Sequence, residues 1–201
     1  MTTSTGTAVL LCTGNPGKIA EMRALLPTGL EVRGLTELGL PLDLPENGDT
    51  LEANALEKAR FGHARTGLPA IADDTGLEVT ALGGAPGVFS ARYASEAKDA
   101  QANMAKLLHE LKGPGDRSAQ FRTVIALVDA DGEHTFEGIV RGTITDAPRG
   151  TGGFGYDPVF LPEMSDLTFG ELDARRKNAI SHRAQAMWKL AQHLSERYRA
   201  R

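Results

Sequence analysis

The stretch that decides the fold class is residues 8–26, which read AVLLCTGNPGKIAEMRALL. Its first part, residues 8–12, is a short apolar run typical of a buried strand. Its last part, residues 18–26, carries apolar side chains at helical spacing. A buried strand that passes through a glycine-containing turn into a helix is the opening of an α/β fold.

Three further helices are predicted beyond this opening. Asp49 and Glu52 have the spacing of a capping box, which predicts a helix from there to about Arg65. An apolar stripe over residues 97–111 predicts the next helix, and the final helix is expected to start near Ser181. These stripes are read as core rather than as binding surface.

Strand-like segments alternate with these helices, and no internal repeat, low-complexity tract or linker is visible. Residues 120–128 and 135–144 flank a turn at residues 129–132, which predicts an antiparallel hairpin within a mixed sheet. The fold class is therefore predicted as α/β, with residues 1–201 forming one domain.

Composition limits the possible partners. The chain has 201 residues and a net charge of −4, which argues against polymeric nucleic acid as a ligand because that binding needs a basic face. No stretch has the apolar length of a membrane span, and residues 1–7 lack the regions of a signal peptide, so a cytoplasmic location is expected. Cys12 is the single cysteine, which excludes an internal disulfide and a cysteine-based metal site.

The turn after the first strand has the chemistry of a phosphate site. Its glycines let backbone N–H groups approach an anion, and the following helix adds its positive end. It lacks the glycine, lysine and hydroxyl pattern of a Walker A loop. A plain helix-entry turn is the alternative interpretation. The candidate residues are Thr13, Gly14, Asn15, Pro16, Gly17 and Lys18.

A second cluster follows an apolar strand that ends in Asp73, Asp74 and Thr75. Adjacent carboxylates repel each other and need a cation, and magnesium is held by one or two carboxylates together with substrate phosphates. A neighbouring carboxylate can also deprotonate a water. Glu46 could supply a further carboxylate. The alternatives are an Asx turn at Asp74 and a solvated surface acid at Glu46.

The segment of residues 150–158, GTGGFGYDP, combines glycine with aromatic side chains. Phe154 and Tyr156 could offer ring faces to a flat, charged ligand and Asp157 a fixed acceptor, while Gly155 belongs to the glycine-rich backbone that would lie against that ligand. A flexible linker would lack the aromatic residues. A tight turn before a buried strand remains the alternative.

A third polar cluster lies at residues 177–183, KNAISHR, where the final helix is expected to begin. Ser181 can cap that helix. His182 and Arg183 would then stand unfavourably against the helix dipole, a cost that a bound anion or a carbonyl oxygen would offset. Together with Lys177 they are candidates for ligand contacts, and a solvated basic stretch is the alternative.

Five motifs together resemble the inosine triphosphate pyrophosphatase family, with greatest similarity to its bacterial dITP/XTP pyrophosphatases. They run in family order between about Val9 and Leu194, at residues 13–18, 72–77, 83–87, 152–157 and 181–183. The resemblance implies an elongated α/β fold of two lobes around a mixed sheet flanked by helices. It also implies a homodimer, a requirement for Mg²⁺, and hydrolysis of noncanonical purine nucleoside triphosphates to monophosphate and pyrophosphate.

The resemblance also implies roles for the candidate residues. The turn from Thr13 to Lys18 would bind phosphate, Asp74 would be the catalytic base and a magnesium ligand, and Glu46 would be another ligand. Thr75 would contact substrate. The segment from Phe154 to Asp157 would hold the base, with Phe154 stacked on it. The side chains of Lys177, His182 and Arg183 would reach the purine edge or the triphosphate. Arg175 and Arg176 depart from the acidic residues that family members often carry there.

Base selection should follow from a donor that meets the 6-oxo group of hypoxanthine or xanthine. A donor from His182 or Arg183 would be left unpaired by the amino group of adenine, which costs about 1–3 kcal/mol per group. Rejection of guanine must arise elsewhere. An aspartyl phosphatase is disfavoured, because Asp73 and Asp74 are adjacent rather than spaced as Asp-x-Asp. A nucleotide sensor without catalysis is the other alternative, and turnover separates it from a hydrolase.

Overall fold

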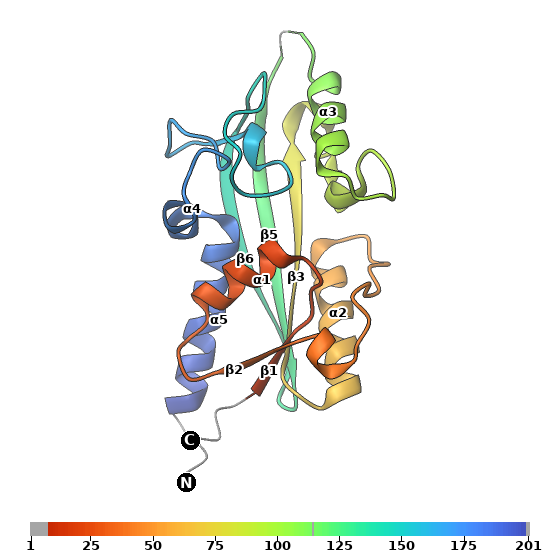
Figure 1. Cartoon of the computed structure of the whole chain (residues 1–201), viewed down its shortest axis with the longest axis vertical. Helices are drawn as coiled ribbons and strands as arrows, with labels where there is room; N and C mark the ends of the chain where they lie inside the picture. The colour runs from red at the N-terminus through yellow and green to blue at the C-terminus, as the bar shows by residue number, and fades with distance from the viewer. Residues whose placement is uncertain (1–7, 114, 200–201) are drawn as a thin grey trace. The chain divides into compact units, whose positions relative to one another are not determined.

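A computed structural model describes residues 8–113 and 115–199 (Figure 1). Residues 1–7, on which the expectation about a signal peptide rests, lie outside the described residues. The strands are β1 (Ala8–Leu11), β2 (Glu31–Gly34), β3 (Ala70–Val79), β4 (Pro86–Gly87), β5 (Ser118–Asp129), β6 (Gly132–Ile144) and β7 (Phe160–Pro162). The α-helices are α1 (Pro16–Leu25), α2 (Leu51–Thr66), α3 (Ala100–Glu110), α4 (Ala174–Ile180) and α5 (His182–Arg199).

The strands form a mixed sheet in the order β2-β1-β3-β5-β6-β7, with β4 paired to β3. Strand β1 runs parallel to β2, with Ala8 opposite Glu31, and parallel to β3, with Leu10 opposite Ala70. Strands β4 and β7 pair antiparallel with β3 and β6. The predicted α/β class with a mixed sheet flanked by helices is therefore confirmed.

Contacts between residues divide the chain into two compact units. Unit 1 comprises the described residues up to 74, residues 124–137 and those from 183 onward. Unit 2 comprises residues 75–123 and 138–182. Strands β3, β5 and β6 each contribute residues to both units, so neither unit is continuous in the sequence.

In unit 1 the two faces of β1 meet different helices. Val9 belongs to a cluster with Met22 of α1 and Met187 of α5. Gly62 of α2 lies against the other face, where a Cβ atom would come within 2.3 Å of the Cys12 Sγ atom. Successive strand side chains point to opposite faces, so the apolar run is buried on both sides. Figure 1 shows α5 and α2 on opposite sides of these strands.

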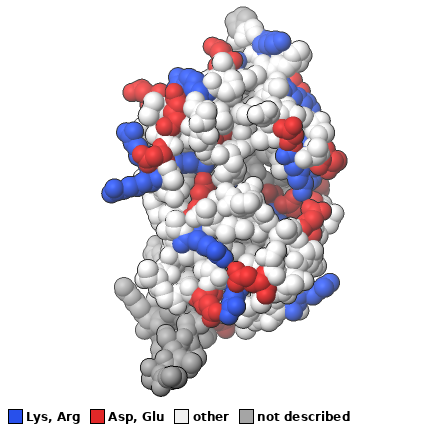
Figure 2. Space-filling model, viewed as in Figure 1, with Lys and Arg blue, Asp and Glu red and all other residues white. Residues whose placement is uncertain are grey.

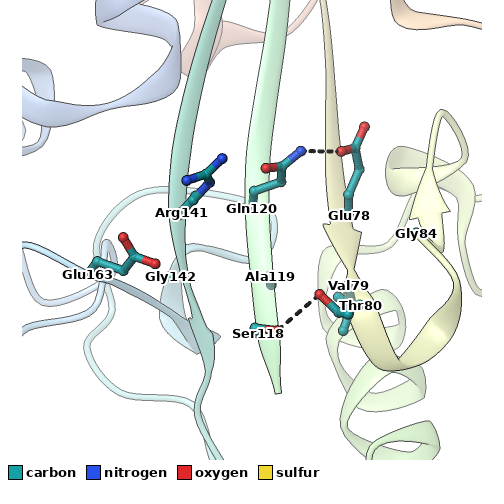
Figure 3. Close-up of a pocket in the computed structure, with 10 residues that line it drawn as sticks. All are labelled: Glu78, Val79, Thr80, Gly84, Ser118, Ala119, Gln120, Arg141, Gly142 and Glu163. Carbon is teal, nitrogen blue, oxygen red and sulfur yellow. Dashed lines mark hydrogen bonds between the residues drawn. The ribbon is translucent and has the colours of Figure 1, made fainter. Parts of the chain in front are cut away.

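In unit 2 the two faces of the sheet differ in character. One face carries an aromatic core that includes Phe121, Phe160 and Phe169. The other face is polar and borders a hollow of about 440 Å³. Figure 3 shows Glu78, Gln120 and Arg141 in a row across β3, β5 and β6 on this face, and the Gln120 amide donates to the Glu78 carboxylate over 2.6 Å. The alternation of polar and apolar residues along each strand produces this division.

Four predicted boundaries were wrong. Strand β3 continues through Asp73 and Asp74 to Val79, so the two carboxylates lie within a strand and not at its end. Helix α2 is capped by Thr50, whose hydroxyl accepts from the Ala53 N–H over 3.1 Å, rather than by the Asp49 and Glu52 pair. Helix α3 begins after Asp99, because that carboxylate caps the helix and excludes residues 97–99 from it. Lys177 lies on a separate short helix, α4, and not at the start of the final helix.

Charged side chains of both signs are interspersed on the face of the molecule shown in Figure 2. This mixture agrees with the small net charge of −4. Among the described residues, no helix is long and apolar enough to cross a membrane.

Candidate active site

The turn between β1 and α1 is exposed and built by local hydrogen bonds. The Asn15 side chain caps α1 by accepting from the Lys18 N–H over 3.1 Å, and the Thr13 hydroxyl accepts from the Asn15 N–H over 3.2 Å. A Cβ atom at Gly14 would lie 3.1 Å from the Leu42 carbonyl oxygen, so glycine permits this close approach. The turn therefore presents the positive end of a ten-residue helix at the surface of unit 1.

Asp73 lies at the centre of a buried ion network in unit 1. Its Oδ2 atom is 3.1 Å from the Lys18 ammonium and 3.2 Å from the Arg183 Nε atom. Arg183, which is 1% exposed, also pairs with Glu21 of α1. Burial alone would raise the pKa of Asp73, but the charges of Lys18, Arg183 and Lys58 outweigh it and hold that pKa well below its usual range. Asp73 is thus a fixed anion that orients two cations.

Asp74 faces a different set of partners. Its Oδ2 atom accepts from the Asn54 amide over 3.0 Å, and its Oδ1 atom lies 3.9 Å from the Lys58 ammonium. The same ammonium donates to Glu46 over 2.6 Å. The Asn54 side-chain oxygen in turn accepts from the Gly48 N–H over 2.8 Å, which ties the loop that carries Glu46 to α2. Two carboxylates thus converge on one cation.

The two neighbouring aspartates are in opposite electrostatic states. Burial raises the pKa of Asp74, and the positive charges of Lys58 and Lys18 oppose this rise only in part. Burial would lower the pKa of Lys58, but Asp74 and Glu46 outweigh it and raise that pKa. A carboxylate with a raised pKa is a stronger base than an ordinary one. Asp74 therefore has the character of a proton acceptor, whereas Asp73 does not.

The unit 1 donors suit a metal that is shared with a ligand. Among residues 8–113 and 115–199, no group of three or more His, Cys, Asp or Glu side chains could hold a metal ion by itself. Glu46 and Asp74 nevertheless both lie near the Lys58 ammonium, so their two carboxylates are close to each other. Magnesium commonly takes one or two protein carboxylates and completes its shell with phosphate oxygens and water.

In unit 2 the glycine-rich loop is fixed by Asp157. Its Oδ2 atom accepts from the Phe154 N–H and from the Lys177 ammonium, each over 2.7 Å. The Lys177 ammonium lies 4.7 Å from the centre of the Phe154 ring. Gly153 has φ +71°, and a Cβ atom there would lie 2.1 Å from Asp157 Oδ2. The glycines therefore permit a loop that holds the half-buried Phe154 ring beside a buried ion pair.

Tyr156 does not offer its ring to a ligand as the sequence predicted. It is 4% exposed and packs in the aromatic core of unit 2. Its hydroxyl donates to the Ser90 carbonyl over 2.9 Å. The physical reason is that a buried phenol must satisfy its hydroxyl while its ring fills the core. Tyr156 therefore anchors the loop.

His182 is held by a hydroxyl and by aromatic rings. Its Nδ1 atom is 2.6 Å from the hydroxyl of Thr123, which is itself 2.7 Å from the hydroxyl of Thr75. The imidazole stacks on Phe121 with ring centres 4.7 Å apart, and Phe169 lies 6.2 Å away. His182 is 3% exposed, so the ring has one fixed orientation.

The predicted residues thus form two sets. Unit 1 brings together the turn of residues 13–18, Glu46, Asp73, Asp74 and Arg183, and unit 2 brings together Thr75, Phe154, Asp157, Lys177 and His182. We call the first set, with Asn54 and Lys58, the unit 1 cluster, and the second, with Phe121 and Thr123, the unit 2 cluster.

Sequence reasoning missed four of these side chains. Asn54 and Lys58 are four residues apart on a helix whose neighbouring Ala55 and Ala59 are buried, so polar residues on a buried face were the available signal. Thr123 follows Ala119 and Phe121 at the buried positions of the alternating part of β5, and a polar residue at such a position was the corresponding signal in unit 2. No feature of the sequence distinguished Phe121 from an ordinary core residue.

The sequence is similar to known proteins over most of its length. A sequence model of the Ham1 family matches residues 9–193. A protein from Porphyromonas gingivalis named dITP/XTP pyrophosphatase is 55% identical, over 90% of this chain and 94% of the relative. A Bacillus subtilis protein of the same name is 46% identical, over 90% of this chain and 94% of its own.

Solved structures give the same result. The Ham1 protein of Staphylococcus aureus superposes with a TM-score of 0.86 and 40% identity, covering 94% of this chain and 99% of that one. A structure from Mycobacterium abscessus, described as a nucleoside-triphosphatase or dITP/XTP pyrophosphatase, has a TM-score of 0.74 and 42% identity, covering 91% and 98%. With the family match spanning residues 9–193, the resemblance predicted from the motifs is confirmed, and the chain belongs to the Ham1 family.

Proposed function

We propose that the protein hydrolyses noncanonical purine nucleoside triphosphates, such as ITP, dITP and XTP, to the monophosphate and pyrophosphate. The observation that carries this proposal is the unit 1 cluster, in which Lys18 of the turn pairs with the buried Asp73 beside the buried Asp74. The names of the relatives at 46% and 55% identity support the same reaction class. The protein is thus a hydrolase of phosphoanhydride bonds that removes deaminated purines from the nucleotide pool.

The triphosphate is assigned to unit 1. The backbone of residues 13–18 and the Lys18 ammonium provide donors and positive charge for phosphate oxygens. Arg183 is fully committed to the same cluster through its pairs with Asp73 and Glu21, which favours a role on the phosphate side rather than at the purine edge.

Asp74 is assigned as the catalytic base, with Glu46 and Asp74 as the residues that would hold Mg²⁺. The Asp74 carboxylate accepts a proton from water, and the water oxygen bonds to the α-phosphorus. The bridging P–O bond between the α- and β-phosphates breaks, and its electron pair leaves with pyrophosphate. When bound with the substrate, Mg²⁺ would neutralise phosphate charge. Labelled water should therefore enter the monophosphate, and label found in pyrophosphate would contradict this assignment.

The purine base is assigned to unit 2. Stacking on the base is assigned to the half-buried Phe154 ring, which lies beside the ion pair of Asp157 and Lys177. Thr75 is assigned to substrate contact at the end of the hydroxyl chain. A donor on His182 would meet the 6-oxo group, whereas adenine would leave that buried donor unpaired. Substrate selection therefore belongs to unit 2 and bond cleavage to unit 1.

We further propose that both units act as one catalytic domain, since β3, β5 and β6 contribute to each. A homodimer and a cytoplasmic location are proposed from the family resemblance and the composition. Polymeric nucleic acid and membranes are not expected as partners.

The deciding experiment measures pyrophosphate release from ITP, XTP, GTP and ATP, with and without Mg²⁺. The wild type is compared with Asp74→Asn and with Asp166→Asn, a control at an exposed position. We expect Mg²⁺-dependent release from ITP and XTP that is lost only in the Asp74 variant. Retained nucleotide binding without release in the wild type would favour a nucleotide sensor instead.

A further inference from the structure

Thr123 lies inside unit 2, is 0% exposed, and has a hydroxyl with two short contacts. The Thr75 hydroxyl is 2.7 Å away and the His182 Nδ1 atom is 2.6 Å away. The hydroxyl carries one proton, and because a buried O–H needs an acceptor, Thr123 donates in one of these hydrogen bonds and accepts in the other. The direction of this two-bond chain sets which nitrogen of the imidazole carries a proton.

The two directions have different consequences for a ligand. If Thr75 donates to Thr123 and Thr123 donates to Nδ1, the neutral His182 ring carries its proton on Nε2 and presents a donor. If Nδ1 donates to Thr123 instead, a neutral ring presents an acceptor at Nε2. In the first direction, Nε2–H can donate to a 6-oxo group on the purine. In the second direction, the unprotonated Nε2 can accept from a 6-amino group.

The surroundings of His182 favour the neutral ring. The imidazole is stacked on Phe121 within a buried aromatic cluster, where a charge would be poorly solvated. The hydroxyl chain, rather than an added proton, therefore controls what the ring offers.

We propose that Thr123 is a positioning residue that holds His182 in the Nε2–H tautomer and thereby selects oxo-purines over amino-purines. The contact between Thr123 and His182 is given by the geometry of unit 2, whereas the direction of the hydroxyl chain and the selectivity rest on the proposed function. In this arrangement the proton order runs from Thr75 through Thr123 to Nδ1.

The tautomer can be measured without substrate. Two-dimensional ¹⁵N spectra of the imidazole nitrogens distinguish the Nε2–H, Nδ1–H and doubly protonated states, and pH 8 lies above the ordinary His pKa of about 6.5. We expect the Nε2–H form of His182 in the wild type and in Thr123→Ser. In Thr123→Val, which removes the hydroxyl at similar volume, we expect a mixture of tautomers. An Nδ1–H or doubly protonated ring in the wild type would overturn the proposal even if the valine variant failed to fold.

Steady-state kinetics then test whether Thr123 affects the preference for ITP over ATP. The ratio of kcat/KM for ITP to that for ATP should fall about tenfold in Thr123→Val, as expected for loss of one buried donor, and should recover in Thr123→Ser. Thr168→Val is the matched control, since Thr168 is 0% exposed and its hydroxyl donates to the Arg149 carbonyl over 2.8 Å. That variant should lose stability while the His182 tautomer and the ITP-to-ATP ratio stay unchanged.

The two readouts separate the possible failures. A wild type that shows the Nε2–H tautomer but hydrolyses no nucleotide would refute the proposed function and leave the positioning role intact. A valine variant with an unchanged tautomer and an unchanged ITP-to-ATP ratio would refute the positioning role and leave hydrolysis intact.

Discussion

The unit 1 and unit 2 clusters differ in the kinds of side chain that they bring together. The unit 1 cluster alternates cations and carboxylates, with Lys18 and Arg183 against Asp73, and Lys58 against Glu46 and Asp74. The unit 2 cluster contains one buried pair, Asp157 with Lys177, surrounded by aromatic rings and hydroxyls. Polyanions need several charges, whereas a flat base needs ring faces and a few oriented edge groups. The contrast indicates which end of a nucleotide each cluster suits.

The largest effect on catalysis is expected from a substitution in the unit 1 cluster. Asp74→Asn should lower kcat by about 100-fold to 10,000-fold, because it removes the proposed general base. The loss should be of similar size for ITP and XTP, since unit 1 is assigned to cleavage and not to selection. Single-turnover assays of both nucleotides measure it. A variant that lost one substrate and kept the other would break the division between the units.

The second prediction concerns folding rather than turnover. Asp73→Asn should lower the free energy of unfolding by about 3–5 kcal/mol, because Lys18 and Arg183 would lose their buried anion. Urea denaturation at pH 7 measures the loss, with Asp166→Asn as the exposed control. Because the folded-state pKa of Asp73 is lowered, its stabilisation is present above the unfolded-state pKa and is lost as pH falls. The difference between Asp73→Asn and the wild type should therefore shrink in acid.

The third prediction tests selection by unit 2. His182→Phe preserves an aromatic ring for stacking on Phe121 but removes the donor. The preference for ITP over ATP should fall by an amount equivalent to about 1–3 kcal/mol. Competition assays with both nucleotides measure the preference. If the preference survived with only kcat reduced, His182 would belong functionally with the cleavage residues.

The smallest effect is expected at Tyr156. Replacing it by phenylalanine removes the hydrogen bond to the Ser90 carbonyl and should cost about 0.5–1.5 kcal/mol of stability. The KM for ITP should stay within twofold, because the ring is a core residue in the structure. A large rise in KM would instead indicate that Tyr156 contacts the purine base, as the sequence predicted.

Much of this arrangement was predictable because local patterns determined it. The apolar run before Thr13 and the glycine turn indicated β1 and α1, and Asp73 and Asp74 stood out where an apolar strand turns polar. The opposite electrostatic states of the two aspartates could not be predicted, since they depend on Lys18 and Lys58, which are distant in the sequence.

Other parts depend on tertiary packing alone. The hydroxyl chain through Thr123 joins Thr75 of β3 to His182 of α5, and no spacing in the sequence predicts that contact. Helix α4 was missed because its cap, Asp173, begins a helix of only seven residues without an apolar stripe. Tyr156 was misread because a glycine-rich segment does not indicate which of its two aromatic rings points into the core.

The close packing of Gly62 against Cys12 has a practical consequence for labelling. The Cys12 thiol is 0% exposed, and burial is the main reason that its pKa is raised to about 12. Because the thiolate is the reactive form, maleimide reagents should not modify the folded protein at neutral pH. A cysteine introduced by Asp166→Cys would then be the single attachment point for a fluorophore, with the native thiol left in place.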